Sequence, residues 1–413
     1  MSVAGVQRVY RRRDRPLEAA RRHGALGLLS LAAVVMGACT VPPSIPGDQA
    51  AEAISLSLEG GEPLEGGEAA LWPSGEPVRF RATAANAIAA RFDADVEDET
   101  WQWSATAGSF SAVFGPETEW RPPPLSTTAA VTVTYTCRVR QRPGLFARYK
   151  PFSVQATAAR IIVTATPGRL LRDGVLDGYR LGVYPDPEAP EFRASAALVR
   201  RQPESYRPPD AFYKVTEDNF SIRLSKHFRL GDYALHYPWF SLGLPQYIAL
   251  DPALVLKIED LIALMQQNGF PQADHIAVIY PFRPPAYNLG MIEQDRDESL
   301  KAVFSMHQYG KAIDLIIDAD ADLVMDDLNA DGVSDVHDAL LIARFVNILD
   351  RRYLAAGDRR LGGAGVYPAH DFHERRPSPY IHIDVRNYTG EAGRLIRWPS
   401  RLPDGSPLEW EHF

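Results

Sequence analysis

The chain has 413 residues, which at about 150 residues per domain predicts two or three domains. Hydrophobic residues make up 46% and charged residues 23%, near the averages of globular proteins, so a wholly disordered or fibrous chain is excluded. The net charge is −8, and the first 38 residues have a surplus of five positive charges, which leaves −13 for the rest. Such an acidic body is a poor nucleic-acid binder, because phosphate neutralisation supplies most of that affinity. Two cysteines exclude a disulfide-rich scaffold and a cysteine-based zinc cluster.

Residues 1–38 are typical of a signal peptide. An arginine-rich segment precedes an apolar run of about 14 residues, Ala25 to Ala38, which is too short to span a bilayer as a helix. Small residues stand directly before Cys39 and resemble a bacterial lipoprotein cleavage box. The resemblance implies a lipid on Cys39, a tether over residues 39–50 and a place in the cell envelope, on the periplasmic face of the outer membrane. The alternative is an ordinary signal peptide followed by a chance cysteine.

Residues 51–165 have the pattern of short strands separated by turns. The alternating segments are Ile54–Leu58, Val78–Ala82, Val131–Val139 and Ile161–Ala165. Several short strands at regular spacing predict an all-β sandwich. Together with Trp101, Trp103 and Trp120, the pattern resembles bacterial immunoglobulin-like (Ig-like) modules, which implies a spacer or adhesion role. Cys137 falls on the apolar face of its strand, so we expect it to pack rather than to react.

Residues 166–223 are mixed and proline-rich, and we interpret them as a connecting region that packs on the C-terminal part of the chain. Residues 224–413 predict a separate α+β domain. Asp251 and Pro252 are a typical helix start, and apolar residues then recur at helical spacing as far as Gln267. Ile276–Tyr280 comes next as a predicted buried strand.

Ionisable residues gather in two segments of the last third of the chain. His307-Gln-Tyr-Gly-Lys-Ala-Ile-Asp314 leads into a strand from which Asp314 points away from the apolar face. His382, Asp384 and Arg386 share the polar face of a second strand. Burying such groups is costly unless water, a metal or mutual pairing satisfies them. Two histidines and one aspartate would leave a fourth zinc position open, as catalysis requires. The alternative is a set of structural His–Asp pairs.

These segments resemble a known family. The motifs at Ser305–Asp314, Gly363–Pro368 and Ile381–Asp384 look like those of the D-Ala-D-Ala carboxypeptidase family of zinc metallopeptidases, in its murein endopeptidase-like branch, and Tyr280–Asn288 is similar to a further motif. The resemblance implies that His307, Asp314 and His382 are zinc ligands. It also implies that Arg283 binds a peptide carboxylate or carbonyl, since its fork suits planar oxyanions. The alternative for Arg283 is a surface salt bridge.

The general base is the point at which the chain departs from the family. Well-known members carry a glutamate three residues before the last zinc ligand, where this chain has Pro379, and others carry a histidine shortly before that ligand. Asp384 is the preferred candidate, because it shares a strand face with His382. The alternatives are His370, His373 and Glu374 in the preceding loop, and an inactive domain that retains zinc is a further one.

An acidic insertion, about residues 318–349, carries a second candidate metal site. Asp327-Leu-Asn-Ala-Asp-Gly332 fits the start of a calcium loop, in which the glycine permits a sharp turn. The segment resembles one dockerin or EF-hand half-motif. Its calcium ligands would be Asp327, Asn329, Asp331, the Val333 carbonyl, Asp335 and Asp338. The alternative is an acidic turn without a metal.

The sequence therefore predicts a multidomain envelope lipoprotein with an N-terminal Ig-like sandwich and a C-terminal zinc peptidase domain that also binds calcium. As a hydrolase it would cut peptidoglycan stem peptides or cross-links of the cell wall, as a D,D-carboxypeptidase or an endopeptidase. The alternative is a non-catalytic peptidoglycan-binding or scaffold lipoprotein that retains the fold.

Overall fold

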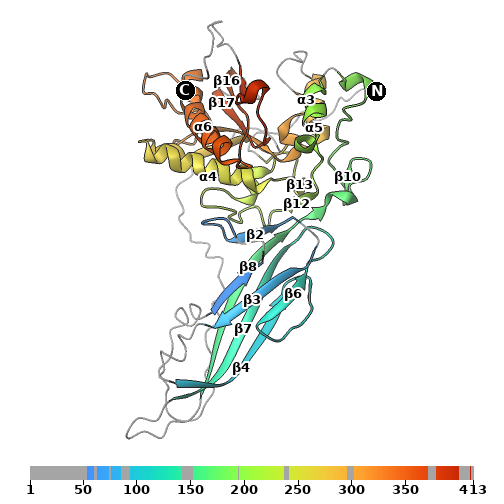
Figure 1. Ribbon diagram of the computed structural model, residues 1–413, viewed down its shortest axis with the longest axis vertical. Helices are drawn as coiled ribbons and strands as arrows, with labels where there is room; N and C mark the ends of the chain where they lie inside the picture. The colour runs from blue at the N-terminus through green and yellow to red at the C-terminus, as the bar shows by residue number, and fades with distance from the viewer. Residues whose placement is uncertain are drawn as a thin grey trace, which may run out of the picture.

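A computed structural model gives the fold of the chain (Figure 1). It describes residues 54–59, 63–73, 76–84, 94–141, 152–193, 195–236, 241–294, 302–370, 378–399 and 410. Over these residues the fold is mixed α/β, with most elements in several sheets and few helices. The predicted signal peptide, Cys39 and the tether lie outside the described residues. Within the described part, no helix combines the length and the apolar composition that a membrane span needs.

Two four-stranded sheets form the elongated lower part of the molecule, which we call the two-sheet region (residues 54–165). One sheet has the order β1 (Ile54–Leu58), β3 (Val78–Ala84), β6 (Glu117–Arg121), β5 (Ser109–Phe110), and the other β2 (Ala69–Trp72), β8 (Phe152–Thr164), β7 (Thr128–Gln141), β4 (Ala94–Ala105). Their alternating apolar faces enclose one buried cluster that includes Trp120 and Tyr135. Cys137 lies in this cluster and is 1% exposed, as its strand pattern predicts.

The connecting region joins this part to the rest through a shared core. It contains β9 (Thr166–Pro167), β10 (Val175–Leu176), β11 (Tyr179–Arg180), α3 (Ala197–Arg201) and β12 (Ala211–Val215). Strands β9 and β12 form a small sheet with β13 (Gln246–Ile248). Val163 and Ala165, at the end of β8, lie in the same buried cluster as the C-terminal helices. The backbone N–H of Lys214 also donates to the Ser126 hydroxyl at 2.8 Å. The connecting region thus packs on the C-terminal part of the chain, as expected.

A five-stranded sheet is the framework of the C-terminal region. Its order is β14 (Ile276–Tyr280), β15 (Ala312–Ile317), β17 (Ser378–Asp384), β16 (Ala364–His370), β18 (Arg397–Trp398). Helices α4 (Pro252–Gln267) and α6 (Val336–Ala356) pack together beside it, and α6 contacts β16 and β17. Helix α5 (Pro285–Gln294) comes directly after β14. Ile313, Leu315, Ile381 and Ile383 are buried in the core with these helices.

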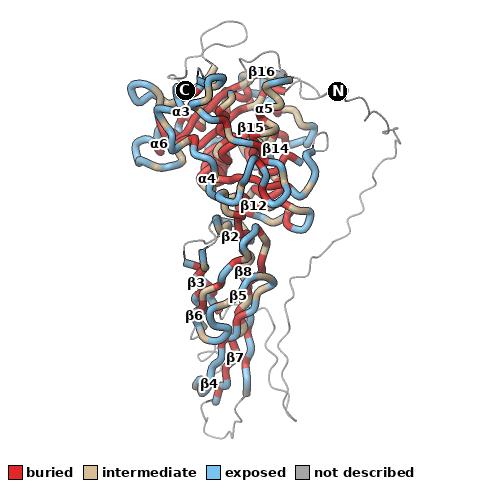
Figure 2. The backbone as a smooth tube through the Cα atoms, turned by 90° about the vertical axis from the view of Figure 1, so that its right-hand side faces the viewer, coloured by how far each residue is buried: buried red, intermediate tan, exposed pale blue. Residues whose placement is uncertain are grey.

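Local sequence explains where these elements begin and how they are buried. The Asp251 side chain caps α4 by accepting from the Ala253 backbone N–H at 2.9 Å, as predicted. The prediction of a buried strand at Ile276–Tyr280 is wrong in its burial: β14 is the edge strand, and four of its five residues are only half-buried. Figure 2 shows the contrast with β15, which is buried along its whole length.

Candidate metal centre

Three ionisable side chains meet where β15 and β17 lie side by side. His307 is in the short helix η6 (Met306–Tyr309), directly before β15. Asp314 in β15 pairs in register with His382 in β17. Gly310 turns the chain from η6 into β15 with a φ of +67°, and a Cβ there would lie 2.5 Å from the Ala249 carbonyl carbon. The glycine of the H-x-x-G-x-A-x-D pattern is thus required by both its conformation and its close approach.

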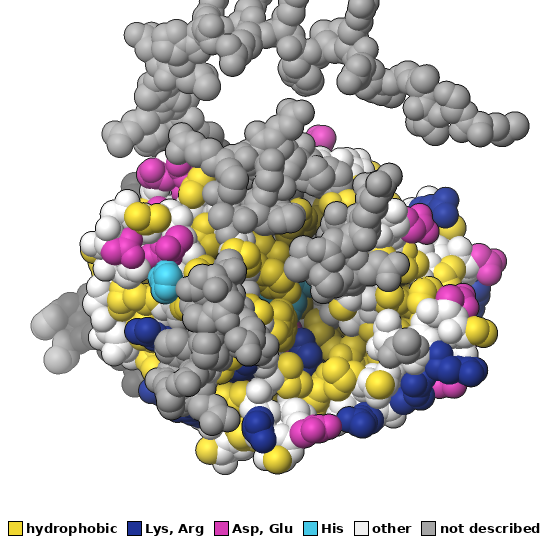
Figure 3. Space-filling view, turned by 90° about the horizontal axis from the view of Figure 1, so that it is seen from above, with side chains coloured by type: hydrophobic (Ala, Val, Ile, Leu, Met, Phe, Trp, Pro, Cys, Tyr) yellow, Lys and Arg dark blue, Asp and Glu magenta, His cyan; other side chains and the backbone are white. Residues whose placement is uncertain are grey.

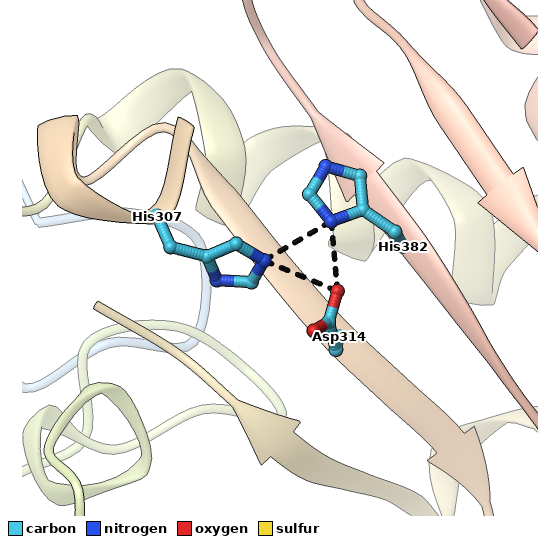
Figure 4. Close-up of side chains that lie close together, drawn as sticks. All are labelled: His307, Asp314 and His382. Atoms are coloured by element: carbon cyan, nitrogen blue, oxygen red, sulfur yellow. Dashed lines mark hydrogen bonds and ion pairs between the residues drawn. The ribbon is translucent and has the colours of Figure 1, made fainter. Parts of the chain in front are cut away.

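The three side chains point one atom each toward a common centre (Figure 4). His307 Nε2 lies 3.1 Å from Asp314 Oδ1 and 3.0 Å from His382 Nδ1, and His382 Nδ1 lies 2.8 Å from Asp314 Oδ1. All three residues are buried. Two nitrogens and a carboxylate oxygen about 3 Å apart fit one face of a tetrahedral zinc site, whose bonds are about 2.0–2.2 Å. The cluster could hold a metal ion.

The outer nitrogen of each histidine already has an acceptor. His307 Nδ1 lies 2.8 Å from the Pro281 carbonyl oxygen, and His382 Nε2 lies 3.2 Å from Asp384 Oδ2. An imidazole that donates its N–H outward presents a lone pair on its other nitrogen, which is the form that binds metals. The hydrogen-bond network therefore directs two lone pairs and one carboxylate at the same point.

Burial and mutual contact set the charges of the cluster. Burial, and then the nearby Arg283 charge, lower the pKa of His307 to about 4. Burial alone would raise the pKa of Asp314, but the two imidazoles outweigh it and hold that pKa low. Burial opposes the charged form of His382, yet the hydrogen bonds to Asp314 and Asp384 raise its pKa. A proton on His382 and a metal ion therefore compete for the same lone pair.

Arg283 lies beside this cluster. Its backbone N–H donates to the His307 carbonyl at 3.2 Å, and its Nη2 donates to the Ser305 hydroxyl at 3.1 Å. Its buried Nε has no hydrogen-bond partner among the described residues. Among the described residues no carboxylate pairs with Arg283, so the side chain does not form the surface salt bridge of the alternative there.

Aromatic side chains surround the same site. The Trp398 ring lies 5.1 Å from the His382 ring, and Tyr367 and Tyr380 stack with centroids 4.5 Å apart. Figure 3 shows hydrophobic side chains around a hollow in which histidine and basic atoms are visible. Sequence reasoning missed Trp398. Gly365 was its signal, because a Cβ there would lie 2.2 Å from the Trp398 ring.

Asp384, the preferred base, lies on the outer side of His382. Its carboxylate is fully buried and accepts from the Gly363 backbone N–H at 2.6 Å and from the Arg386 guanidinium. It contacts the His382 nitrogen that faces away from Asp314. This position suits a group that orients His382, rather than a base that acts within the cluster. His373, Glu374 and the His370 side chain lie outside the described residues.

The predicted calcium loop forms a turn whose carboxylates are occupied by backbone N–H groups. Gly332 takes the sharp turn with a φ of +88°, and the Asp327 carboxylate accepts from its N–H at 2.7 Å. Asp335 caps α6, and the buried Asp338 accepts from the N–H groups of Leu328 and Asp335. Among the described residues, no three acidic side chains of this loop offer oxygens within 4.8 Å of one another, whereas Asp318, Asp320 and Asp326 just before it do. Asp338 thus takes part in the start of α6, and the set of six calcium ligands stays a prediction.

Comparisons of the chain with models of protein families, with curated proteins and with solved structures found no match. The fold and the site therefore define the class of this protein by themselves. It is a mixed α/β protein with a buried cluster of two histidines and one aspartate that could hold a metal ion.

Proposed function

We propose that the chain is a zinc-dependent peptidase that hydrolyses the stem peptides or cross-links of peptidoglycan. The observation that carries the proposal is the convergence of His307 Nε2, Asp314 Oδ1 and His382 Nδ1 within 2.8–3.1 Å, with the outer nitrogen of each imidazole already bound. Nitrogen and carboxylate donors in this arrangement suit zinc. A zinc ion supplies Lewis acidity, which activates water and a carbonyl group for hydrolysis.

The peptide substrate is supported by Arg283. Arg283 lies next to His307, whose pKa its charge lowers, and its buried Nε–H has no hydrogen-bond partner among the described residues. A planar fork of this kind binds a carboxylate or a developing oxyanion with two parallel hydrogen bonds. The family resemblance of the motifs at 305–314, 363–368 and 381–384 favours a D-Ala-ending peptide as the substrate class.

We infer that Asp384 orients His382 and does not serve as the base. Its two oxygens are engaged by Gly363, Arg386 and His382, so neither is free to accept a proton from a reacting group. That leaves His370, at the end of β16, and His373 and Glu374, which follow it in the sequence, as candidates for proton transfer.

The two-sheet region fits an Ig-like spacer in this proposal. It shares its core with the C-terminal region at one end, and β7 extends away from that junction. A lipid on Cys39 would then place the chain in the cell envelope, with the metal centre held away from the membrane.

Hydrolysis of defined muropeptides by the purified full-length protein tests the proposal. We expect loss of a terminal D-Ala or of a cross-link by mass spectrometry, abolition by a chelator and recovery with zinc. His382→Ala should be inactive, and the matched control His227→Ala, which removes another imidazole that contacts a carboxylate, should be active. Zinc binding without hydrolysis of any muropeptide would favour the non-catalytic binding protein instead.

A further inference from the structure

A fully buried lysine lies behind the metal centre, on the helix side of the sheet. Lys257 in α4 is 0% exposed and donates to Asp350 Oδ1 in α6 at 2.7 Å. Asp350 is also 0% exposed, and its Oδ2 accepts from Arg397 Nη2 at 2.7 Å. Three charges from α4, α6 and β18 thus meet in the interior. A lysine on the apolar face of a helix, between Leu254 and Leu261, was the sequence signal for it.

The same lysine contacts the strand that carries His382. Its Nζ donates to the main-chain carbonyl of Asp384 at 2.9 Å. Two glycines also lie against this residue. A Cβ at Gly362 would lie 1.7 Å from the Asp384 carbonyl oxygen, and the Gly363 N–H donates to the Asp384 carboxylate at 2.6 Å. Asp384 is therefore held at its carbonyl by Lys257 and at its carboxylate by Gly363 and Arg386.

The buried Lys257–Asp350 ion pair is poorly explained by a contribution to stability alone. Removing charges from water is costly, and well-packed apolar residues often replace a buried ion pair without loss of stability. An apolar side chain at position 257 could not, however, donate to the Asp384 carbonyl. The pair therefore supplies a directed hydrogen bond at the end of β17, two residues from His382.

We propose that Lys257, held by Asp350, is a positioning residue for the metal centre. It fixes the main chain of Asp384, the Asp384 carboxylate fixes the His382 imidazole, and His382 Nδ1 faces His307 and Asp314. This inference rests on the proposed function for one point, which is that the bound metal ion is zinc.

The test is the zinc affinity of Lys257→Met in the full chain, measured by competition with a chromophoric chelator. We expect affinity to fall about 3–10-fold, less than the 10–100-fold typical of direct outer partners of a ligand. The control is Glu259→Gln, two residues along the same helix, which perturbs the mostly buried His227–Glu259 pair (2.6 Å) and should leave zinc affinity unchanged.

A spectroscopic readout separates positioning from a loss of overall stability. In the zinc-loaded protein, the Nε2–H proton of His382 should shift and exchange faster with water in Lys257→Met, as seen by nitrogen-edited NMR. It should not change in Glu259→Gln. Should Lys257→Met not fold, Asp350→Asn is the second variant, because it keeps the shape and removes the charge that holds the ammonium group; its zinc affinity should also fall.

Two failures are distinguishable. A wild-type chain that does not bind zinc overturns the proposed function together with this inference. If the wild-type chain binds zinc and the folded variant binds it with the same affinity and an unchanged His382 signal, the positioning role alone is overturned.

Discussion

The two-sheet region and the C-terminal region differ in where their charged side chains lie. In the two-sheet region, ion pairs such as Arg81–Glu117 lie on the outer face, where both side chains are 61% exposed, while the interior holds aromatic and aliphatic residues. In the C-terminal region, Lys257, Asp350 and Asp384 are completely buried around one strand. Exposed pairs contribute about 0–1 kcal/mol, whereas breaking a buried pair costs about 3–5 kcal/mol. The candidate metal centre lies in the region that buries its charges.

The two regions nevertheless form a continuous body. Val163 and Ala165 belong to the C-terminal core, and Asn219 Nδ2 donates to the Thr128 hydroxyl at 3.1 Å across the junction. Strand β7 begins at this junction and has 14 residues, so at about 3.3 Å per residue it extends roughly 45 Å from it. In the proposed function, a spacer of this length would separate the metal centre from the far end of the sheets.

Removing a metal ligand should have the largest effect. Changing His307, Asp314 or His382 to Ala should lower zinc affinity more than 100-fold, since outer partners alone contribute about 10–100-fold. Titration with zinc checks this. Cys137→Ser, a buried change in the two-sheet region, should leave zinc affinity unchanged, and equal losses in both would break the comparison.

Arg283→Lys should retain zinc but lose about 100-fold in activity, because a point charge does not reproduce a bidentate fork and a lost oxyanion donor costs about that much. Turnover of muropeptides together with zinc content measures both effects. Unchanged turnover would remove Arg283 from the site.

Asp384→Asn distinguishes an orienting group from a base. As an orienting group it should weaken zinc affinity about 10–100-fold, with activity partly restored by excess zinc. A base would instead lose about 10²–10⁴-fold in rate with zinc retained. His373→Ala and Glu374→Gln are the companion variants, and one of them should show that second pattern.

The calcium loop should show a smaller effect. Asp335→Ala removes the N-cap of α6 and should cost about 1 kcal/mol of unfolding free energy without calcium present. If the loop also binds calcium, the ion raises the melting temperature of the wild type by mass action, and Asp327→Ala abolishes that rise. A melting curve that calcium does not move would leave the capped turn as the whole role of the loop.

The smallest effect belongs to the exposed pair. A double-mutant cycle on Arg81 and Glu117 should give a coupling free energy below about 1 kcal/mol, reduced further by salt. The same cycle on Lys257 and Asp350 should give a larger value. Similar values for the two pairs would contradict the contrast between the regions.

The sequence predicted local features well and mutual arrangement less well. Alternation placed Cys137, Asp314 and His382 on the correct faces, because strand geometry decides which side a residue takes. Alternation could not show which nitrogen of His382 the Asp384 carboxylate contacts. That contact depends on how β17 ends and on the hydrogen bond from Gly363. The Lys257–Asp350 pair joins residues 93 positions apart, so spacing carries no signal for it. The calcium pattern predicted the turn at Gly332 but not the capping box, in which Asp335 caps α6 and Asp338 accepts from the Asp335 N–H.

The metal content of the purified full-length protein tests the central claim most directly. After zinc loading and removal of excess metal, elemental analysis should give one zinc per wild-type chain and well below one for His382→Ala. Zinc that stays stoichiometric in His382→Ala, or a wild-type chain that retains none, would contradict the assignment of His307, Asp314 and His382 as a zinc centre.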